Sequence, residues 1–260
     1  MTGEDLKRQM AAMGLKPDDK LMLHSSMKAI GEIEGGADAV IDAFTEYLCD
    51  GLFMTPAHTW KQMSATYNLF DPATEPSCVG IISNLLLRKP GSVRSLHPTH
   101  SIAAYGPGAA SYVAGDENFH TPCDPKGCFG RLRDVHAKIL LAGVSHARNT
   151  YIHSIEESFD IPERFTAAPV LFKVKMPDGT LKPVEMYRHY NPRLEHISEA
   201  FDKLGELYLE KGAVRRTRLG NADCLLCDAG RLFEVTGEVL RRQPDFFIPN
   251  KSHKDYQVVF

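Results

Sequence analysis

The sequence predicts an α/β fold with an added antiparallel β-hairpin, organised as one domain over residues 1–260. Short apolar runs typical of strands alternate with helical periodicity along most of the chain, which is the pattern of α/β proteins. No internal repeat or low-complexity linker divides the chain, and its 43% hydrophobic residues are enough for a sizeable core. The third observation is Asp178-Gly179 between two strand-like runs, which indicates a hairpin turn.

The first half of the chain begins with a helix and then alternates strands with helices. Thr2 and Asp5 form a capping-box pattern ahead of the first helix. The apolar run at 21–26 predicts a buried strand, and the periodic segment after it predicts a helix. Residues 52–60 predict another strand that leads into an irregular loop, where Ser77 is expected to cap the next helix.

The second half contains the stretch KILLAGVSHARNTYIHSIEE. Residues 138–142 predict a buried strand, and a helix is expected from Asn149 or Thr150 to about Phe159. After the hairpin, the pattern predicts an amphipathic helix over 197–212, a strand pair or a strand and turn over 215–229, and a last helix that ends near Pro244.

Charge and hydropathy exclude several classes of partner. The formal net charge of -3 shows no basic excess, so neither nucleic acid nor a membrane surface is expected as a partner. The amino terminus has no apolar signal core, and no run approaches the ~18 apolar residues of a membrane span. We therefore expect a soluble, cytoplasmic protein.

The cysteines do not indicate a disulfide framework or a zinc site. Without a secretion signal, the six cysteines are expected to be reduced thiols. Cys224 and Cys227 have the spacing of half a zinc site, but Cys123 and Cys128 are too far apart to complete it. Both pairs are interpreted as structural.

The clearest catalytic candidate is His153. Glu156 follows it by three residues, so on a helix the two side chains share a face and the carboxylate can orient the imidazole. A histidine steered in this way can act as a general base with a pKa near neutrality, removing a proton from a nucleophile that attacks a carbonyl. The same spacing is also typical of a surface ion pair or a half-buried histidine.

Two further segments carry candidate binding residues. Ser25 and Ser26 close a strand before glycines and a helix, so with Lys28 they form a candidate phosphate site, although the segment also fits a plain turn. The block RSLHPTHSIAAYG at 94–106 places two histidines close together. Its spacing matches no common metal motif, which disfavours metal binding there.

Five blocks, taken together and in order, resemble the aminoglycoside 3-N-acetyltransferase family. They are LMLHSSMKAIGEIEGGADAVIDAF, FDPATEPSCVG, RSLHPTHSIAAYG, KILLAGVSHARNTYIHSIEE and LGNADCLLCDAGRLF, and the resemblance runs from about residue 5 to 248. It implies a three-layer α/β/α sandwich of that family's type, with an added antiparallel hairpin. It also implies acetyl transfer from acetyl-coenzyme A to a small-molecule amine, without a metal.

The resemblance also assigns roles to individual residues. It implies that His153 is the base and Glu156 its partner. It also implies that seven further residues contact the coenzyme or form the pocket: Ser25, Ser26, Lys28, Arg94, Ser95, His97 and Ser101. Asn84 stands where many antibiotic-modifying members have a glutamate, which makes an aminoglycoside acceptor less secure. Glu157 and Asp160 remain as carboxylates for an acceptor ammonium group.

Other functions stay open at this level. The acceptor could be an aminoglycoside in antibiotic resistance or another amine in a biosynthetic pathway. A metal-dependent hydrolase would use His58, His97, His100, His120 or His153 with Glu156. A non-catalytic relative would bind coenzyme A without turnover. The oligomeric state is open, with a homodimer as one option.

Overall fold

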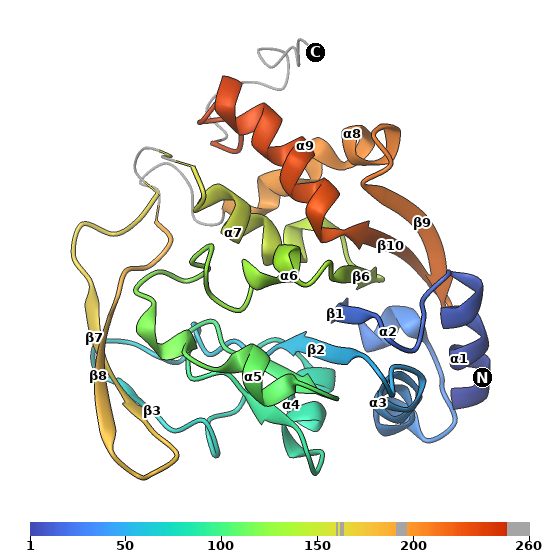
Figure 1. The fold of residues 1–260 in the computed structure, drawn as a ribbon, viewed down its shortest axis with the longest axis horizontal. Coiled ribbons are helices and arrows are strands. Elements are labelled where there is room, and N and C mark those ends of the chain that lie inside the picture. The colour runs from blue at the N-terminus through green and yellow to red at the C-terminus, as the bar shows by residue number, and fades with distance from the viewer. Residues whose placement is uncertain (160, 162–163, 191–196, 249–260) are drawn as a thin grey trace.

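A seven-stranded mixed sheet forms the centre of the molecule (Figure 1). The computed structural model describes residues 1–159, 161, 164–190 and 197–248. The strand order of the sheet is β4-β5-β2-β1-β6-β10-β9. Its strands are β1 (Lys20–Ser25), β2 (Leu52–Pro56), β4 (Val93–Arg94), β5 (Ile102–Tyr105), β6 (Lys138–Ala142), β9 (Val214–Leu219) and β10 (Ala222–Asp228).

The three central strands run in the same direction. β1 pairs in parallel with β2 and with β6, whereas the outer strands of the sheet pair antiparallel. Strands covered on both faces need apolar side chains at every position, which explains the continuous apolar runs at 21–23 and 139–142. Because β1, β2 and β6 are parallel, the loops after them meet at one edge of the sheet.

Helices cover both faces of this sheet and give the three-layer arrangement that the sequence predicts. Side chains alternate along β1, so Leu21 and Leu23 belong to one core and Met22 to the other. The first core is covered by α1 (Gly3–Ala12), α2 (Met27–Ile30), α3 (Gly36–Tyr47) and α4 (Ile81–Arg88). The second is covered by α5 (Ala109–Val113), α6 (Arg131–Asp134), α7 (Tyr151–Glu156), η3 (Ile197–Leu204), α8 (Gly205–Glu210) and α9 (Ala229–Arg242). Two further 3₁₀ turns are η1 (Asp116–Asn118) and η2 (His146–Arg148).

A second, small sheet lies on the side of the molecule opposite α1 in Figure 1. It contains β3 (Leu69–Phe70), β7 (Val170–Lys175) and β8 (Leu181–Met186). β7 and β8 form the antiparallel hairpin expected at Asp178-Gly179, where the φ of 84° at Gly179 suits glycine. β3 adds in parallel to β7, and a small apolar cluster that includes Phe70 and Phe172 fills one face.

Some local expectations need correction. Gly80, and not Ser77, precedes α4, because the Ser77 hydroxyl instead accepts a hydrogen bond from the Val79 N–H. The amphipathic segment 197–212 is a 3₁₀ helix followed by the short α8. The Thr2 and Asp5 capping box is confirmed.

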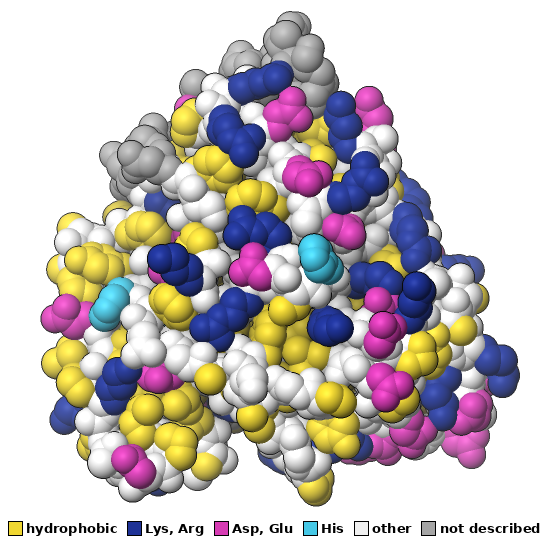
Figure 2. Space-filling view, viewed as in Figure 1, with side chains coloured by type: hydrophobic (Ala, Val, Ile, Leu, Met, Phe, Trp, Pro, Cys, Tyr) yellow, Lys and Arg dark blue, Asp and Glu magenta, His cyan; other side chains and the backbone are white. Residues whose placement is uncertain are grey.

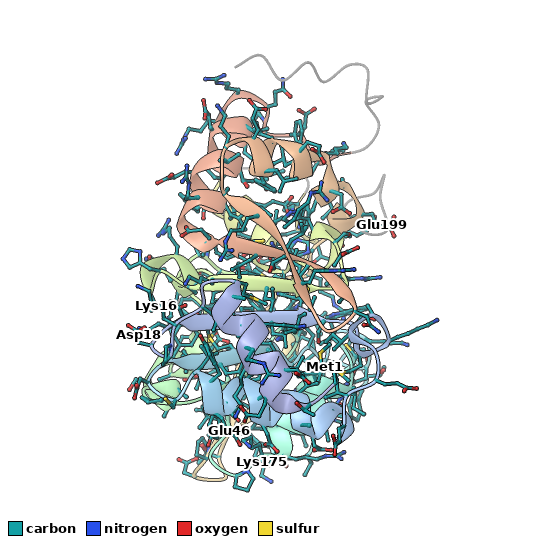
Figure 3. All side chains as sticks on the ribbon, turned by 90° about the vertical axis from the view of Figure 1, so that its right-hand side faces the viewer. Met1, Lys16, Asp18, Glu46, Lys175 and Glu199 are labelled. Atoms are coloured by element: carbon teal, nitrogen blue, oxygen red, sulfur yellow. The ribbon has the colours of Figure 1, made fainter. Side chains whose placement is uncertain are left out.

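The face drawn in Figure 2 mixes Lys and Arg side chains with Asp and Glu. Exposed charged residues such as Lys16, Asp18 and Glu46 project from the ribbon (Figure 3). Within the described ranges, no helix combines the length and the apolar character needed to cross a bilayer.

Candidate active site

A cavity of about 1100 Å³ opens at the carboxyl edge of the central strands. The segments that follow β1, β2 and β6 supply much of its lining, at 25–27, 56–61 and 144–150. Residues 188–190, which follow the hairpin, and the segment 78–83 complete the wall. This is the edge at which open α/β sheets usually bind ligands.

Close packing of two loops shapes the edge near β6. Gly143 ends β6 with a φ of 69°, and a Cβ on it would lie 2.2 Å from the Cβ of Ala29. Only glycine allows α2 to approach the end of the strand so closely. The Ser26 N–H donates to the Ala142 carbonyl at 2.9 Å, which joins the turn after β1 to the end of β6.

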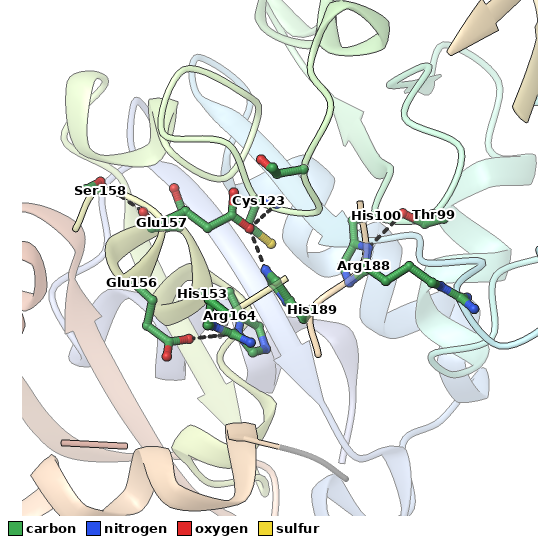
Figure 4. Close-up of polar contacts among 12 residues, drawn as sticks. Thr99, His100, Cys123, His153, Glu156, Glu157, Ser158, Arg164, Arg188 and His189 are labelled. Atoms are coloured by element: carbon green, nitrogen blue, oxygen red, sulfur yellow. Dashed lines mark hydrogen bonds and ion pairs between the residues drawn. The ribbon is translucent and has the colours of Figure 1, made fainter. Parts of the chain in front are cut away.

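His153 lies on α7 and lines the cavity, with Glu156 one turn further on (Figure 4). Its Nδ1 is 3.0 Å from Oε2 of Glu156, whose side chain is 0% exposed. Nη2 of Arg164 donates to the same Oε2 at 2.8 Å and lies 2.7 Å from Nδ1. The predicted pair is therefore present, and a buried arginine extends it to a cluster of three.

Burial keeps the imidazole neutral. It lowers the pKa of His153 below its ordinary value, Glu156 opposes this shift and the Arg164 charge adds to it. The expected pKa near neutrality is corrected downward, because the sequence pattern showed neither the burial of the ring nor the arginine beside it. A neutral imidazole at pH 7 is already in the form that accepts a proton.

A second histidine and carboxylate pair lies beside the first. Nε2 of His189 is 2.5 Å from Oε1 of Glu157, which also accepts the Cys123 N–H at 2.9 Å (Figure 4). The rings of His189 and His153 have centroids 4.5 Å apart. Burial raises the pKa of Glu157 to about 8, and burial also lowers the pKa of His189 well below its usual value. Both shifts favour the uncharged form of each partner.

His58 and His100 extend the histidine cluster along the cavity wall. Their ring centroids are 4.7 Å apart, and His100 lies 6.0 Å from His189 by the same measure. Nε2 of His58 is 3.1 Å from the Thr150 hydroxyl. Despite this density of imidazoles, no group of three His, Cys, Asp or Glu side chains in the described part of the chain is arranged to hold a metal ion.

Ser25 and Ser26 both line the cavity, whereas Lys28 does not. The Ser26 hydroxyl accepts the Ala29 N–H at 3.3 Å and so caps α2. This helix has only four residues, so its dipole adds little to anion binding, contrary to the expectation from sequence. Lys28 is exposed on α2, and its expected contact with the coenzyme stays a prediction.

The 94–101 block has a structural role that the sequence did not indicate. Arg94 Nε donates to the Ser101 hydroxyl, and its terminal nitrogens donate to carbonyl groups of residues 57, 72 and 75. The Ser95 hydroxyl accepts the Ile102 N–H, and His97 Nδ1 accepts the His100 N–H at 2.9 Å. None of Arg94, Ser95, His97 or Ser101 lines the cavity. Their internal hydrogen bonds hold the loops behind the wall, which fits the pocket-forming alternative, and direct contact with the coenzyme stays a prediction.

Of the two predicted acceptor carboxylates, the structure describes Glu157, which does not line the cavity. Glu157 is engaged with His189 and with the backbone at Cys123, and Asp160 lies outside the described residues. Asn84 accepts the Ser77 N–H and donates to the carbonyls of Ser77 and Gly80. Its amide thus fixes the loop before α4, an arrangement that a carboxylate could not fully reproduce because it has no N–H donor.

Further charged or imidazole side chains of the site had not been predicted from the sequence, among them Lys61 after β2 and Arg148 after β6. Arg164, Arg188 and His189 reach the cavity through the segment before the hairpin and the segment after it. A histidine next to an arginine at 188–189, directly after a strand, was the one local sign, and it is too common to predict a site.

Known proteins resemble this chain in sequence and in fold. A sequence model of a protein family, described as aminoglycoside 3-N-acetyltransferase, matches residues 22–241. The chain belongs to the aminoglycoside 3-N-acetyltransferase family. Members of this family are acyltransferases, so the resemblance and the enzyme class expected from the sequence are confirmed.

Individual relatives match over most of their length. Aminoglycoside N(3)-acetyltransferase IX of Micromonospora chalcea is 27% identical over 257 residues, covering 90% of this chain and 91% of the relative. Aminoglycoside N(3)-acetyltransferase VII of Streptomyces paromomycinus is 28% identical, with 88% of each chain covered.

Solved structures show the same fold. The apoenzyme of aminoglycoside acetyltransferase AAC(3)-IVa is 26% identical with a TM-score of 0.80, covering 95% of this chain and 90% of that one. A mutant of the same enzyme, solved in complex with a gentamicin, gives the same values. AAC-IIIb, solved as a binary complex with CoASH, is 22% identical with a TM-score of 0.79, covering 93% of this chain and 97% of that one.

Proposed function

We propose that this chain is an N-acetyltransferase that uses acetyl-coenzyme A as donor and His153 as general base. One observation carries the proposal: the His153 imidazole lines the cavity while its Nδ1 contacts the buried Glu156. A carboxylate can only accept, so this contact favours a proton on Nδ1, whereas Nη2 of Arg164, 2.7 Å away, can only donate to that atom. Nη2 also donates to Glu156 at 2.8 Å, and we assign its hydrogen bond to the carboxylate and the Nδ1 proton to the imidazole. In this tautomer His153 Nε2 carries no proton and can accept one.

The residues suggest a direct transfer. Nε2 of His153 removes a proton from the amine as its nitrogen attacks the thioester carbonyl carbon. Glu156 stabilises the imidazolium that forms, in the same way that it orients the neutral ring. When the carbon–sulfur bond breaks, the imidazolium returns the proton to the departing thiolate. The products are an amide and free coenzyme A, and the histidine is neutral again.

The coenzyme is assigned to the wall formed after β1 and β6. Ser25 is half-buried at the end of β1, and Arg148 is exposed in the η2 turn after β6. Both line the cavity, and the Ser26 to Ala142 hydrogen bond holds the two segments together. A hydroxyl and a guanidinium on one wall suit a phosphate-bearing ligand.

The test is His153→Gln with release of free thiol from acetyl-coenzyme A as readout, against a panel of amines. Turnover should fall by ~10²- to 10⁴-fold while calorimetric affinity for coenzyme A changes little. His120→Gln is the matched control, since His120 is exposed and bonds to the Glu185 carbonyl away from the cavity. Unchanged turnover in His153→Gln would contradict the assignment of the base.

A further inference from the structure

The charged side chains that line the described part of the cavity are all cationic. They are Lys61, Arg148, Arg164 and Arg188, and no Asp or Glu lines the cavity among the described residues. Arg164 is paired with the buried Glu156. The other three form no ion pair with any described carboxylate. The described lining of the cavity therefore presents positive charge that no described carboxylate compensates.

Backbone carbonyl groups hold Arg188 in place, and no described carboxylate pairs with it. Its Nη2 donates to the Trp60 carbonyl at 2.7 Å and to the Met63 carbonyl at 3.1 Å. Its backbone N–H donates to the Thr166 hydroxyl at 3.2 Å. Both hydrogens of Nη2 are used in this way, so neither of the guanidinium's two-nitrogen forks, Nη1 with Nη2 or Nε with Nη2, is left for a bidentate contact. Nε and Nη1 remain as separate charged donors, and each can give one hydrogen bond to a carboxylate or phosphate oxygen.

Lys61 belongs to the same part of the wall. It follows Trp60, whose carbonyl accepts a hydrogen bond from Arg188, so the backbone next to Lys61 is joined to the Arg188 guanidinium across 128 positions of the sequence. Lys61 is exposed and also lines the cavity. A mobile ammonium beside an anchored guanidinium can adjust to an oxyanion that the guanidinium fixes.

Arg188 and Lys61 come from other segments than the proposed coenzyme wall: they follow β8 and β2, whereas Ser25 ends β1 and Arg148 follows β6. Arg188 directly precedes His189, whose ring is 4.5 Å from that of His153. In acetyl-coenzyme A the phosphates lie at the far end of the pantetheine arm from the thioester. With the thioester at His153 and the arm along the Ser25 and Arg148 wall, Arg188 and Lys61 face the acceptor.

We propose that the acceptor is an amine that also carries an oxyanion, a phosphate or a carboxylate, bound by Arg188 together with Lys61. The same side chains would repel a polycationic aminoglycoside, because like charges oppose binding and so select against the wrong partner. This inference rests on the proposed function and names the acceptor class of the same site.

The experiment compares matched amines that differ in the anionic group. The pairs are ethanolamine and phosphoethanolamine, glucosamine and glucosamine 6-phosphate, and cadaverine and lysine, with gentamicin as the polycation. Each is titrated calorimetrically into protein saturated with coenzyme A. In at least one pair the anionic member should bind at least ~10-fold more tightly, with a preference that weakens as salt rises. The phosphate and carboxylate pairs distinguish the two oxyanions.

Arg188→Gln and Lys61→Gln should each reduce this preference and leave coenzyme A affinity nearly unchanged. Lys28→Gln is the control, because Lys28 is exposed but does not line the cavity. The proposal is overturned if no anionic member binds more tightly than its neutral or cationic partner. It is also overturned if gentamicin binds best, or if both substitutions weaken only coenzyme A.

Thiol release with the same pairs separates this inference from the proposed chemistry. Arg188→Gln should raise the acceptor KM by ~10-fold or more with little change in the KM for acetyl-coenzyme A. If the anionic member binds in an Arg188-dependent way but no amine is acetylated, the proposed function fails and the recognition stands. If acetylation depends on His153 but not on Arg188 or Lys61, the function stands and the acceptor class is wrong.

Discussion

Replacing either of two adjacent glutamates by glutamine should have opposite effects on stability. Glu156 is fully buried and balances the charge of Arg164, which is 4% exposed. Glu156→Gln keeps the shape but leaves the guanidinium buried without a counter-ion. Removing one partner of a buried pair costs about 3–5 kcal/mol. For a domain of this size that corresponds to a Tm lower by roughly 6–20 °C.

Glu157→Gln is the matched control because Glu157 is equally buried but has a pKa raised to about 8. A group whose pKa is raised in the folded state stabilises the fold at pH values below its pKa in the unfolded chain. For Glu157 this contribution is lost as pH rises toward 8. Glutamine imitates the protonated acid and has no charge to lose. The Tm of the Glu157→Gln variant, measured relative to that of the parent protein, should therefore rise between pH 5 and pH 8. The Glu156→Gln variant should stay destabilised over the whole range.

Thermal unfolding by circular dichroism, with thiol release in parallel, checks both variants. Adding Arg164→Met to Glu156→Gln removes the unpaired charge and should recover much of the lost Tm. Turnover should remain at least ~10-fold low, because the imidazolium of His153 still lacks its carboxylate. Recovery of both stability and turnover would show that Glu156 only neutralises Arg164. A Glu157→Gln variant less stable than Glu156→Gln at pH 7 would refute the charge states assigned to both pairs.

Two further predictions concern acid stability and the coenzyme wall. Burial lowers the pKa of His24 in β1 to about 3. As pH falls, the unfolded chain therefore takes up a proton on this imidazole before the folded chain does. The stability present above pH 6.5 is lost as pH falls toward 3, and the free energy of unfolding drops by about 1.4 kcal/mol per pH unit. His24→Leu should flatten this acid limb in urea titrations at pH 5 to 7, and an unchanged slope would show that His24 is not the group responsible. Arg148→Gln should weaken coenzyme A by ~10-fold and reduce the salt dependence of its binding, measured calorimetrically at two ionic strengths. Equal losses in Arg148→Gln and Lys28→Gln would instead indicate a nonspecific charge effect.

Short-range geometry is what the sequence by itself determined. His153 and Glu156 are three residues apart, and helical geometry places such residues on one face whatever surrounds the helix. The capping box at Thr2 and the hairpin turn at Asp178-Gly179 depend in the same way on neighbouring residues. The strand and helix alternation was sufficient for the α/β class, because burial on both faces of a sheet demands continuous apolar strands.

Burial was the first property that the sequence could not supply. Arg94 and Ser101 are polar residues in a dense polar block, which suggested a ligand site. In the folded chain they bond to one another and to the carbonyl of residue 57. A polar side chain satisfies its hydrogen bonds with whichever groups the fold brings near, and the sequence does not show which those are.

The partners of residues far apart in the sequence were the second property that the sequence could not supply. Arg164 joins Glu156, His189 joins Glu157 across 32 residues, and Arg188 reaches the carbonyl of Trp60 across 128. These contacts exist because the segments that flank the hairpin pack against the carboxyl edge of the central sheet. Packing between segments distant in sequence depends on the whole fold. The tertiary structure alone therefore decided the charge of the cavity, and with it the kind of acceptor proposed.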